Sequence, residues 1–339
     1  MSLLKTFTWH KPFQLESGDA LAELEIAYHT YGTLNASRDN VVWVCHALTA
    51  NSDVAEWWSG LTGEGKVWDP GKYFIVCANI LGSCYGTSGP LSRNPATGEP
   101  YYSSFPSFTI RDMVRAHMLL REHLGIEKIA LLAGGSMGGY QVLEWVAAEP
   151  ERIGRLFLIT TGASESAWGI AIHTAQRMAI EADQTWRDPS PTGGWNGVKA
   201  ARAIGMLTYR NYQTFVALQT DPEIEKIDRF KASSYIEYQG EKLAKRFNAQ
   251  SYWLLTKAMD SHNIARGRAP RTEDVLAAIT QKSLIIGITS DILCPAEEQR
   301  FLARNMPQAA YYEIDSRFGH DGFLIEFERI GKILQEWLK

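Results

Sequence analysis

A serine flanked by glycines stands where a strand pattern gives way to a helix pattern. Residues 129–133 form a short apolar run typical of a buried strand, and QVLEWVAAEPERIG, which begins at residue 141, has the spacing of a helix that ends near Pro150. Between them lies Gly134-Gly135-Ser136-Met137-Gly138, a G-x-S-x-G sequence. In this context the motif is typical of a sharp turn that holds a nucleophilic serine above a parallel sheet. We therefore predict that Ser136 is a nucleophile.

A glycine-rich turn between a strand and a helix has two other uses: close packing, and the binding of a phosphate at the helix N-terminus. The spacing here matches neither G-x-G-x-x-G nor a P-loop with its lysine, whereas the serine turn accounts for every letter of the motif. The Met137 N–H would then lie at the start of the helix, where it could stabilise an oxyanion formed beside Ser136.

Further apolar runs alternate with helix patterns along the chain. Strand patterns lie at residues 41–44, 73–78, 156–160, 283–289 and 309–314, helix patterns at 110–125 and 326–338, and an antiparallel extension at 21–32. Such alternation indicates right-handed βαβ units, with ligand groups gathered at the carboxyl ends of the strands. Together with the serine turn, it predicts an α/β-hydrolase fold with a mostly parallel central sheet.

The strand pattern disappears between about residues 164 and 280, where helical, polar and aromatic segments follow one another. We interpret residues 164–280 as an inserted helical lid domain, and residues 1–163 with 281–339 as the catalytic domain. Within the lid, WRDPSPTGGWNG at 186–197 has the proline and glycine content of a loop, and its two tryptophans are expected to pack.

A serine nucleophile needs a base and an acid that orients the base, and in this fold they follow in the order serine, acid, histidine. Asp291 comes directly after the strand pattern SLIIGIT, and His320 lies beyond the last strand pattern. We predict that both act with Ser136. Asp315 is the rival acid, but it stands five residues before His320 on the same loop and would approach less naturally.

The segment VVWVCHALTAN ends a strand pattern, and such a turn supplies the second oxyanion donor in this fold. We assign that role to the Leu48 N–H, and we expect His46 to shape the loop as a structural residue. A metal site is not expected, because the sequence contains no H-x-x-x-H and no paired-cysteine spacing.

Composition points to a small-molecule partner. There are 34 Lys and Arg against 38 Asp and Glu, a formal charge of -4, without long basic runs that would favour nucleic acid or a membrane surface. The four cysteines lack CxxC spacing, and the start MSLLKTFTWH is polar, so we expect reduced thiols and a cytoplasmic location. No apolar run approaches the roughly 20 residues that a membrane helix needs.

Motifs along nearly the whole chain resemble those of the homoserine O-acetyltransferase family, α/β-hydrolase-fold acyltransferases of methionine synthesis. They are CHALTAN at 45–51, NILGSCYGTSGP at 79–90, NPATGEPY and FPSFTIRDMV within 94–114, GGSMGG at 134–139, ARAIGMLTYR at 201–210, SDILCP at 290–295 and FGHDGF at 318–323. The combination of the serine turn with TIRDMV and GHDGF is highly specific.

The resemblance implies a catalytic triad of Ser136, Asp291 and His320, with Leu48 and Met137 as oxyanion donors. It also implies that Arg202, Tyr209 and Asp321 contact the amino-acid substrate, and we expect Thr49 to be a further contact. These assignments make chemical sense, because an arginine can clamp the carboxylate of homoserine while Asp321 accepts from its ammonium group. Without the resemblance, an arginine on an exposed helical face would most often be only solvated.

The implied reaction is ping-pong acetyl transfer from acetyl-CoA, a co-substrate rather than a cofactor, to the L-homoserine hydroxyl through an acyl-serine. Serine O-acetylation, homoserine O-succinylation and carboxylesterase-type hydrolysis stay open as alternatives, because the triad does not separate them. A non-catalytic receptor of the same fold is disfavoured, since all three triad members are present. The resemblance also implies a homodimer, which we expect to form through the helical lid.

Overall fold

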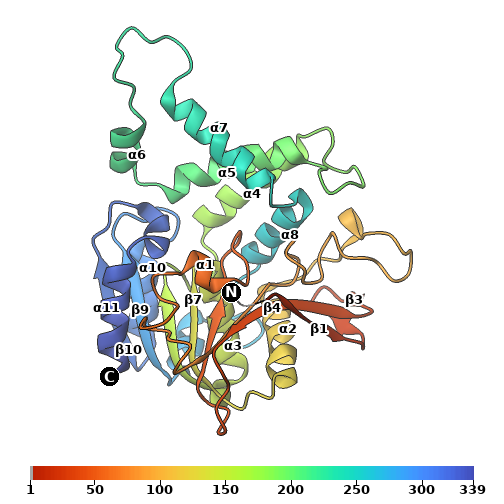
Figure 1. Cartoon of the computed structure of the whole chain (residues 1–339), viewed down its shortest axis with the longest axis vertical. Helices are drawn as coiled ribbons and strands as arrows, with labels where there is room; N and C mark the ends of the chain where they lie inside the picture. The colour runs from red at the N-terminus through yellow and green to blue at the C-terminus, as the bar shows by residue number, and fades with distance from the viewer. Residues whose placement is uncertain (1–2) are drawn as a thin grey trace.

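A long, mostly parallel sheet runs through the computed structural model, which describes residues 3–339 (Figure 1). Within those residues it has eight strands in the order β1-β4-β6-β5-β7-β8-β9-β10. The strands are β1 (Lys5–Trp9), β4 (Leu24–Tyr31), β5 (Val41–Cys45), β6 (Phe74–Ala78), β7 (Ile129–Gly135), β8 (Ile153–Ile159), β9 (Lys282–Ile288) and β10 (Ala309–Ile314). A separate ribbon pairs β2 (Phe13–Gln14) with β3 (Ala20–Leu21). The predicted strands are confirmed, with ends displaced by up to three residues.

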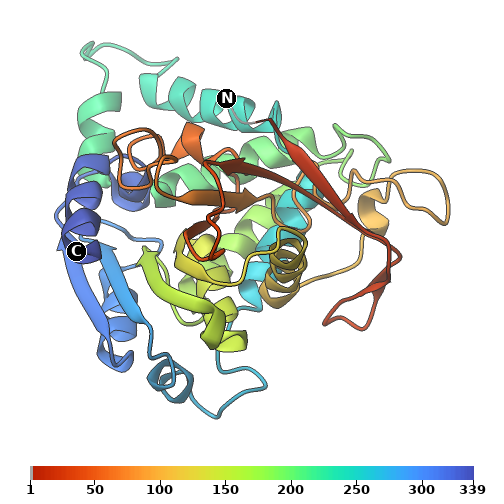
Figure 2. The same ribbon diagram turned by 60° about the horizontal axis from the view of Figure 1, so that its bottom comes forward.

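Strand direction divides the sheet into two parts. From β6 to β10 every neighbouring pair is parallel, whereas β1 pairs antiparallel with β4 and β4 antiparallel with β6. Figures 1 and 2 show the red N-terminal strands and the blue C-terminal strands on opposite sides of the molecule. The parallel strands therefore end at a common edge, which collects the turns after β5, β7, β9 and β10.

Successive side chains of the central strands enter two hydrophobic cores, one on each face. On β5, Val41 and Trp43 belong to one core and Val42 and Val44 to the other, the period of two that a strand buried on both faces requires. The first core is covered by α2 (Ile110–His123), α3 (Met137–Ala148) and α10 (Ala296–Asn305), and the second by α1 (Val54–Trp57) and α11 (Phe327–Leu338).

The chain between residues 164 and 280 is helical, apart from loops and an isolated bridge between Ser164 and Asn263. Its helices are α4 (Ala167–Glu181), α5 (Trp195–Tyr209), α6 (Tyr212–Gln219), α7 (Lys231–Ala244), α8 (Ala249–Asp260) and α9 (Thr272–Ala277). Helices α4 to α7 lie beyond one end of the sheet, at the top of Figure 1. The division into two domains at 163/164 and 280/281 remains a prediction.

The expected loop at 186–197 is corrected at its end. Trp195, Asn196 and Gly197 form the first turn of α5, because Gly194 takes the left-handed conformation (φ 77°) and redirects the chain into the helix. Trp186 and Trp195 are partly buried against the first core, as expected.

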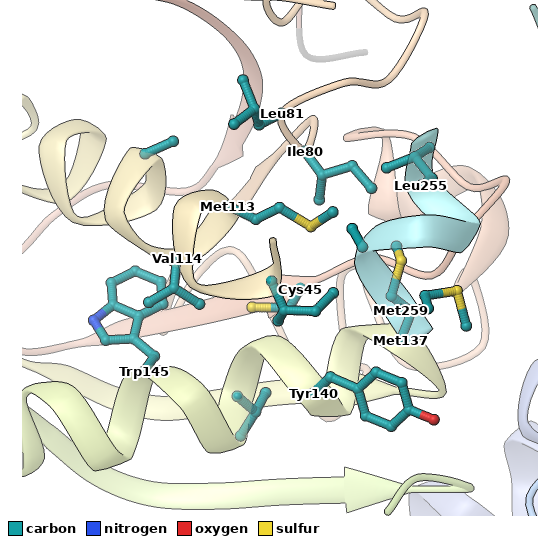
Figure 3. Close-up of a cluster of buried hydrophobic side chains, with 14 of the residues drawn as sticks. Cys45, Ile80, Leu81, Met113, Val114, Met137, Tyr140, Trp145, Leu255 and Met259 are labelled. Atoms are coloured by element: carbon teal, nitrogen blue, oxygen red, sulfur yellow. The ribbon is translucent and has the colours of Figure 1, made fainter. Parts of the chain in front are cut away.

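Helix α8 is anchored in the same core as the helix that follows the serine. Leu255 and Met259 of α8 gather with Met137 and Tyr140 of α3 in one buried cluster (Figure 3). Helix α8 is therefore packed against the helix that follows Ser136.

A buried carboxylate joins α3 to the segment after α8. Glu144 is 2% exposed and accepts from Arg111 Nε at 3.0 Å and from Arg268 Nη1 at 2.6 Å. Removing one partner of such a buried group leaves charge unpaired, which costs far more than breaking an exposed pair.

We expect Glu144→Ala to lower the free energy of unfolding by about 3 kcal/mol, because Arg268 then loses its carboxylate partner and Arg111 keeps only Glu16. Urea unfolding followed by circular dichroism measures this loss. Glu297→Ala is the matched control, since Glu297 pairs with Arg300 in an exposed position and should change stability by less than about 1 kcal/mol. Equal losses in both variants would contradict a structural role for the buried carboxylate.

Two further properties concern the environment of the protein. All four cysteines lie within residues 3–339 and are free thiols, three buried and Cys84 partly exposed. No helix in that part of the chain combines the length and apolar character that crossing a membrane would need.

Candidate active site

Ser136 occupies a strained turn between β7 and α3. Its φ of 54° and ψ of -130° lie outside the regions that ordinary residues adopt, and such strain is characteristic of functional positions. Glycine is required on either side of Ser136 because a side chain there would collide with neighbouring backbone atoms. A Cβ at Gly138 would lie 2.2 Å from the Cys45 carbonyl oxygen, and one at Gly134 would lie 2.4 Å from the backbone of Gly138. The turn predicted from G-x-S-x-G is therefore present.

The three predicted triad residues meet at the edge of the sheet. His320 Nε2 lies 2.9 Å from Ser136 Oγ, and His320 Nδ1 lies 2.7 Å from Asp291 Oδ2. The other carboxylate oxygen, Oδ1, accepts from the backbone N–H groups of Leu293 and Cys294 at 2.8 and 2.9 Å. All three triad side chains are buried, so the hydrogen bonds between them are largely shielded from bulk water.

The charge on Asp291 favours a proton on His320. Burial alone would lower the pKa of the His320 imidazole, but the adjacent Asp291 carboxylate outweighs it, and the net pKa lies above its ordinary value of 6.5. A base with a raised pKa accepts the hydroxyl proton of Ser136 more readily. The rival acid Asp315 lies elsewhere, where its carboxylate accepts from Thr289 Oγ1 at 3.0 Å.

The loop after β5 is held by a buried histidine. His46 Nε2 accepts from the Ile80 N–H at 3.1 Å, so Nδ1 carries the proton and donates to the Ala47 carbonyl at 2.9 Å. Burial lowers the pKa of His46 to about 4, so the ring is neutral and structural. This arrangement positions Leu48, which lines the same cavity as Ser136. Met137, the first residue of α3, has an N–H without a partner inside its own helix.

A small cavity opens above Ser136. Its walls come from the β5 loop, the lid helices α4, α5 and α8, and the loops after β9 and β10. Seven of the nine predicted site residues line it: Leu48, Thr49, Ser136, Arg202, Tyr209, His320 and Asp321. Asp291 lies behind His320, and Met137 lies beneath Ser136 in the core. The Arg202 guanidinium stacks on the Tyr209 ring at 5.2 Å.

Known proteins resemble this chain in both sequence and architecture. A family model described as alpha/beta hydrolase fold matches residues 40–327. A homoserine O-acetyltransferase of Cyclobacterium marinum is 50% identical over 331 residues, 98% of this chain and 94% of that protein. The chain belongs to the homoserine O-acetyltransferase family. A second homoserine O-acetyltransferase, from Nostoc punctiforme, is 44% identical over 96% of this chain and 93% of its own length.

Solved structures that are similar to this chain include a member of the same family. The crystal structure of homoserine O-acetyltransferase from Bacillus anthracis matches with a TM-score of 0.92 and 25% identity, covering 100% of this chain and 98% of that one. The acetyl esterase MekB matches with a TM-score of 0.87 at 21% identity over 99% of this chain and 96% of its own, which shows the shared fold alone. The expected α/β-hydrolase fold and homoserine O-acetyltransferase family are therefore confirmed.

One of the predicted substrate-binding residues, Asp321, already forms an ion pair within the protein. Asp321 Oδ2 lies 3.2 Å from Arg210 Nη1, so the carboxylate expected to meet an ammonium group is shared with a cation. Sequence reasoning missed Arg210, although it closes the quoted motif ARAIGMLTYR. A signal was present in the unlike charges of Arg210 and Asp321, but nothing in the sequence places them side by side.

Helix α4 contributes cavity residues that sequence reasoning also missed. Ile172, His173 and Gln176 all line the cavity, and His173 Nδ1 lies 2.9 Å from Asp260 Oδ1 of α8. Their spacing of three and four residues would have marked one face of a helix, but not which face looks toward Ser136.

Within the described chain, ligand atoms of Asp291, Cys294 and His320 lie within 4.8 Å of one another and could in principle hold a metal. Both nitrogens of His320 and both oxygens of Asp291 are already engaged in hydrogen bonds. Burial raises the pKa of the Cys294 thiol well above its ordinary value, which disfavours the thiolate that a metal would need. The chemistry of this donor set fits the triad better than a metal site.

Proposed function

We propose that this chain transfers the acetyl group of acetyl-CoA to the side-chain hydroxyl of L-homoserine, through an acyl-serine at Ser136, in methionine biosynthesis. The observation that carries the proposal is the 2.9 Å contact between Ser136 Oγ and His320 Nε2 in a cavity that also holds Arg202. Within residues 3–339 Arg202 has no ion pair, so its charge is available to a substrate carboxylate. Family membership supports the choice of homoserine.

The first half-reaction forms the acyl-enzyme. His320 Nε2 takes the proton of Ser136 Oγ as the oxygen attacks the thioester carbonyl carbon. The resulting oxyanion would accept from the Leu48 and Met137 N–H groups. The carbon–sulfur bond then breaks, and the proton held by His320 passes to the departing sulfur, which leaves as free coenzyme A. Asp291 keeps the imidazole oriented and stabilises its charged form.

The second half-reaction consumes the acyl-enzyme. His320 takes the proton of the homoserine hydroxyl, whose oxygen attacks the acetyl carbonyl of acyl-Ser136. The ester bond to Ser136 breaks, and the proton returns from His320 to Oγ, which releases O-acetylhomoserine. Water is a competing acceptor. The buried triad beneath the helical lid supports transfer, because a bound acceptor reaches the ester in a fixed orientation while bulk water is kept out.

The acceptor would be held by its charged groups. Arg202 would bind the carboxylate, with Tyr209 stacked beneath the guanidinium and Thr49 on the opposite loop. Asp321 would face the ammonium group while it remains paired with Arg210. No cofactor is required by this chemistry, since the thioester itself is the activated acyl donor.

We further propose a cytoplasmic homodimer that forms through the lid. The free cysteines agree with a reducing compartment. Large apolar side chains are exposed on the lid: Leu207, Tyr212, Leu218, Ile224, Ile227 and Tyr238, with Ile224 and Ile227 above 90%. Exposed apolar side chains of this size support a protein contact surface on the lid. Sedimentation equilibrium of the full chain tests the proposal, and a mass corresponding to one chain would contradict it.

The reaction is tested by measuring kcat/KM for each pairing of acetyl-CoA or succinyl-CoA with L-homoserine or L-serine, with coenzyme A release and product mass followed together. We expect acetyl-CoA with L-homoserine to be fastest. A strong preference for serine, or for succinyl-CoA, would overturn the assignment of acceptor or donor. Rapid turnover of p-nitrophenyl acetate that homoserine does not stimulate would instead indicate a hydrolase.

A further inference from the structure

The end of lid helix α5 packs against the segment that carries His320, residues 315–321, which we call the His320 loop. Gly319 in this loop has a left-handed backbone with a φ of 63°. A Cβ at that position would lie 2.6 Å from the Tyr209 carbonyl oxygen and 3.0 Å from the Arg210 carbonyl carbon. Glycine adopts this backbone conformation without steric cost and leaves room for the neighbouring chain. The backbone at the end of α5 therefore lies against the backbone of the His320 loop.

Two contacts without formal charge join the same segments. The ring centroids of Tyr209 and His320 are 5.8 Å apart, so the last residue of α5 lies beside the base itself. Thr214 in the first turn of α6 donates a hydrogen bond to the Arg317 carbonyl oxygen. The lid thus contacts the His320 loop from two successive helices.

An ion pair is the third contact between the lid and the His320 loop. Arg210, the residue that caps the C-terminus of α5, places Nη1 3.2 Å from Oδ2 of Asp321. Both side chains are largely buried, that of Arg210 being 28% exposed and that of Asp321 17%. Partial burial reduces the screening of the pair by water. Because Asp321 directly follows His320, the pair restrains the residue next to the base.

The charge of Asp321 also acts on His320. Burial lowers the pKa of the His320 imidazole, whereas the Asp291 carboxylate, followed by those of Asp321 and Glu298, raises it. The titratable groups around the ring come from four segments: Asp291 and Cys294 between β9 and α10, Glu298 of α10, Tyr209 of α5, and Asp321 of the His320 loop. Arg210 is paired with one of these acids and therefore offsets part of the negative charge beside the base.

We propose that Arg210 is a positioning residue that ties the His320 loop to the lid and offsets the charge that Asp321 places beside the base. This inference rests on the proposed role of His320 as the base that activates Ser136. It does not depend on which acceptor takes the acetyl group, so it is tested on the first half-reaction alone.

The measurement is the rate of Ser136 acylation by acetyl-CoA without an acceptor, followed across pH by rapid quenching and intact-protein mass spectrometry. Arg210→Met keeps an unbranched side chain but removes the charge. We expect the acid limb of its profile to move upward by about 0.5 pH unit, because Asp321 then raises the pKa of His320 without a paired cation. The rate on the plateau should fall about twofold to fivefold, because the loop loses one of its contacts with the lid.

Three variants separate the charge of Arg210 from a merely structural contact. Arg210→Lys retains a cation and should return the acid limb to its wild-type position. Asp321→Asn removes the anion while Arg210 remains, so its acid limb should move to lower pH than that of the wild type. Thr214→Val removes an uncharged contact between the same segments and should lower the plateau rate without moving the acid limb.

The outcomes that would overturn the proposal are distinct. An acid limb that does not move in Arg210→Met, or that moves equally in Thr214→Val, would show that the ion pair has no electrostatic role at the base. If Arg210→Met does not fold, Asp321→Asn decides, and an unmoved acid limb in that variant would overturn the proposal. A wild type that forms no acyl-enzyme would overturn the proposed function and this inference with it, whereas normal acylation with one pH profile in all variants would overturn this inference alone.

Discussion

Ser136→Ala is expected to abolish the acyl-enzyme and to lower kcat for acetyl transfer by about 10⁴- to 10⁶-fold, because no other group in the cavity replaces the attacking oxygen. Rapid mixing with acetyl-CoA, acid quenching and intact-protein mass spectrometry would show an acetyl adduct on the wild type and none on the variant. An undiminished adduct in Ser136→Ala would place the nucleophile elsewhere.

A matched variant separates loss of the nucleophile from loss of the turn. Thr161 Oγ1 donates to the Ser136 carbonyl at 2.9 Å, so Thr161→Val removes a hydrogen bond to the backbone of the same residue while leaving Oγ in place. This variant should still form the adduct. If both variants lose it, the architecture of the turn rather than the hydroxyl would explain the loss in Ser136→Ala.

Asp291→Asn should lower kcat by about 10⁴-fold with little change in the fold, because an amide cannot hold the imidazole in the required tautomer or stabilise its charge. Asp315→Asn is the control, since Asp315 contacts Thr289 rather than His320 and should retain activity. A large loss in Asp315→Asn with activity kept in Asp291→Asn would exchange the roles of the two acids.

The pH dependence of kcat/KM, compared between the wild type and Asp291→Asn, tests the electrostatic role of Asp291. His320 acts as a base only in its neutral form, and its pKa is raised above 6.5, so kcat/KM of the wild type should fall as pH decreases through a value above 6.5. Removing the negative charge removes the main cause of the raised pKa. The residual activity of Asp291→Asn should therefore fall at a lower pH than that of the wild type.

Much of the fold and of the candidate triad could be predicted because the sequence signals are local. The sequence around Ser136 predicts a sharp turn between a strand and a helix. Its signals are the apolar run before Ser136, the glycines on either side and the helix pattern that follows. Asp291 and His320 could be proposed because parallel strands end at a common edge, so residues that follow β9 and β10 must approach the residue that follows β7. The order of these residues along the chain therefore indicated that they lie close together in space.

The amino-acid end of the cavity was less predictable. Resemblance suggested Arg202, Tyr209 and Asp321, but Asp321 lies beside Arg210, and Gln176 was not anticipated at all. These contacts join α4, α5 and the loop after β10, segments whose sequences describe helices without saying how each is rotated or tilted. That rotation depends on close packing, such as the approach that Gly205 permits between α4 and α5.

Sequence alone thus predicted the nucleophile and the order of its partners and indicated the family, because each prediction depends on short motifs and on the geometry of a parallel sheet. Tertiary structure decided which oxygens and cations around the acceptor are already paired. Pairing of this kind depends on atoms brought together from distant segments to within about 3 Å, and no local pattern of residues records such a distance.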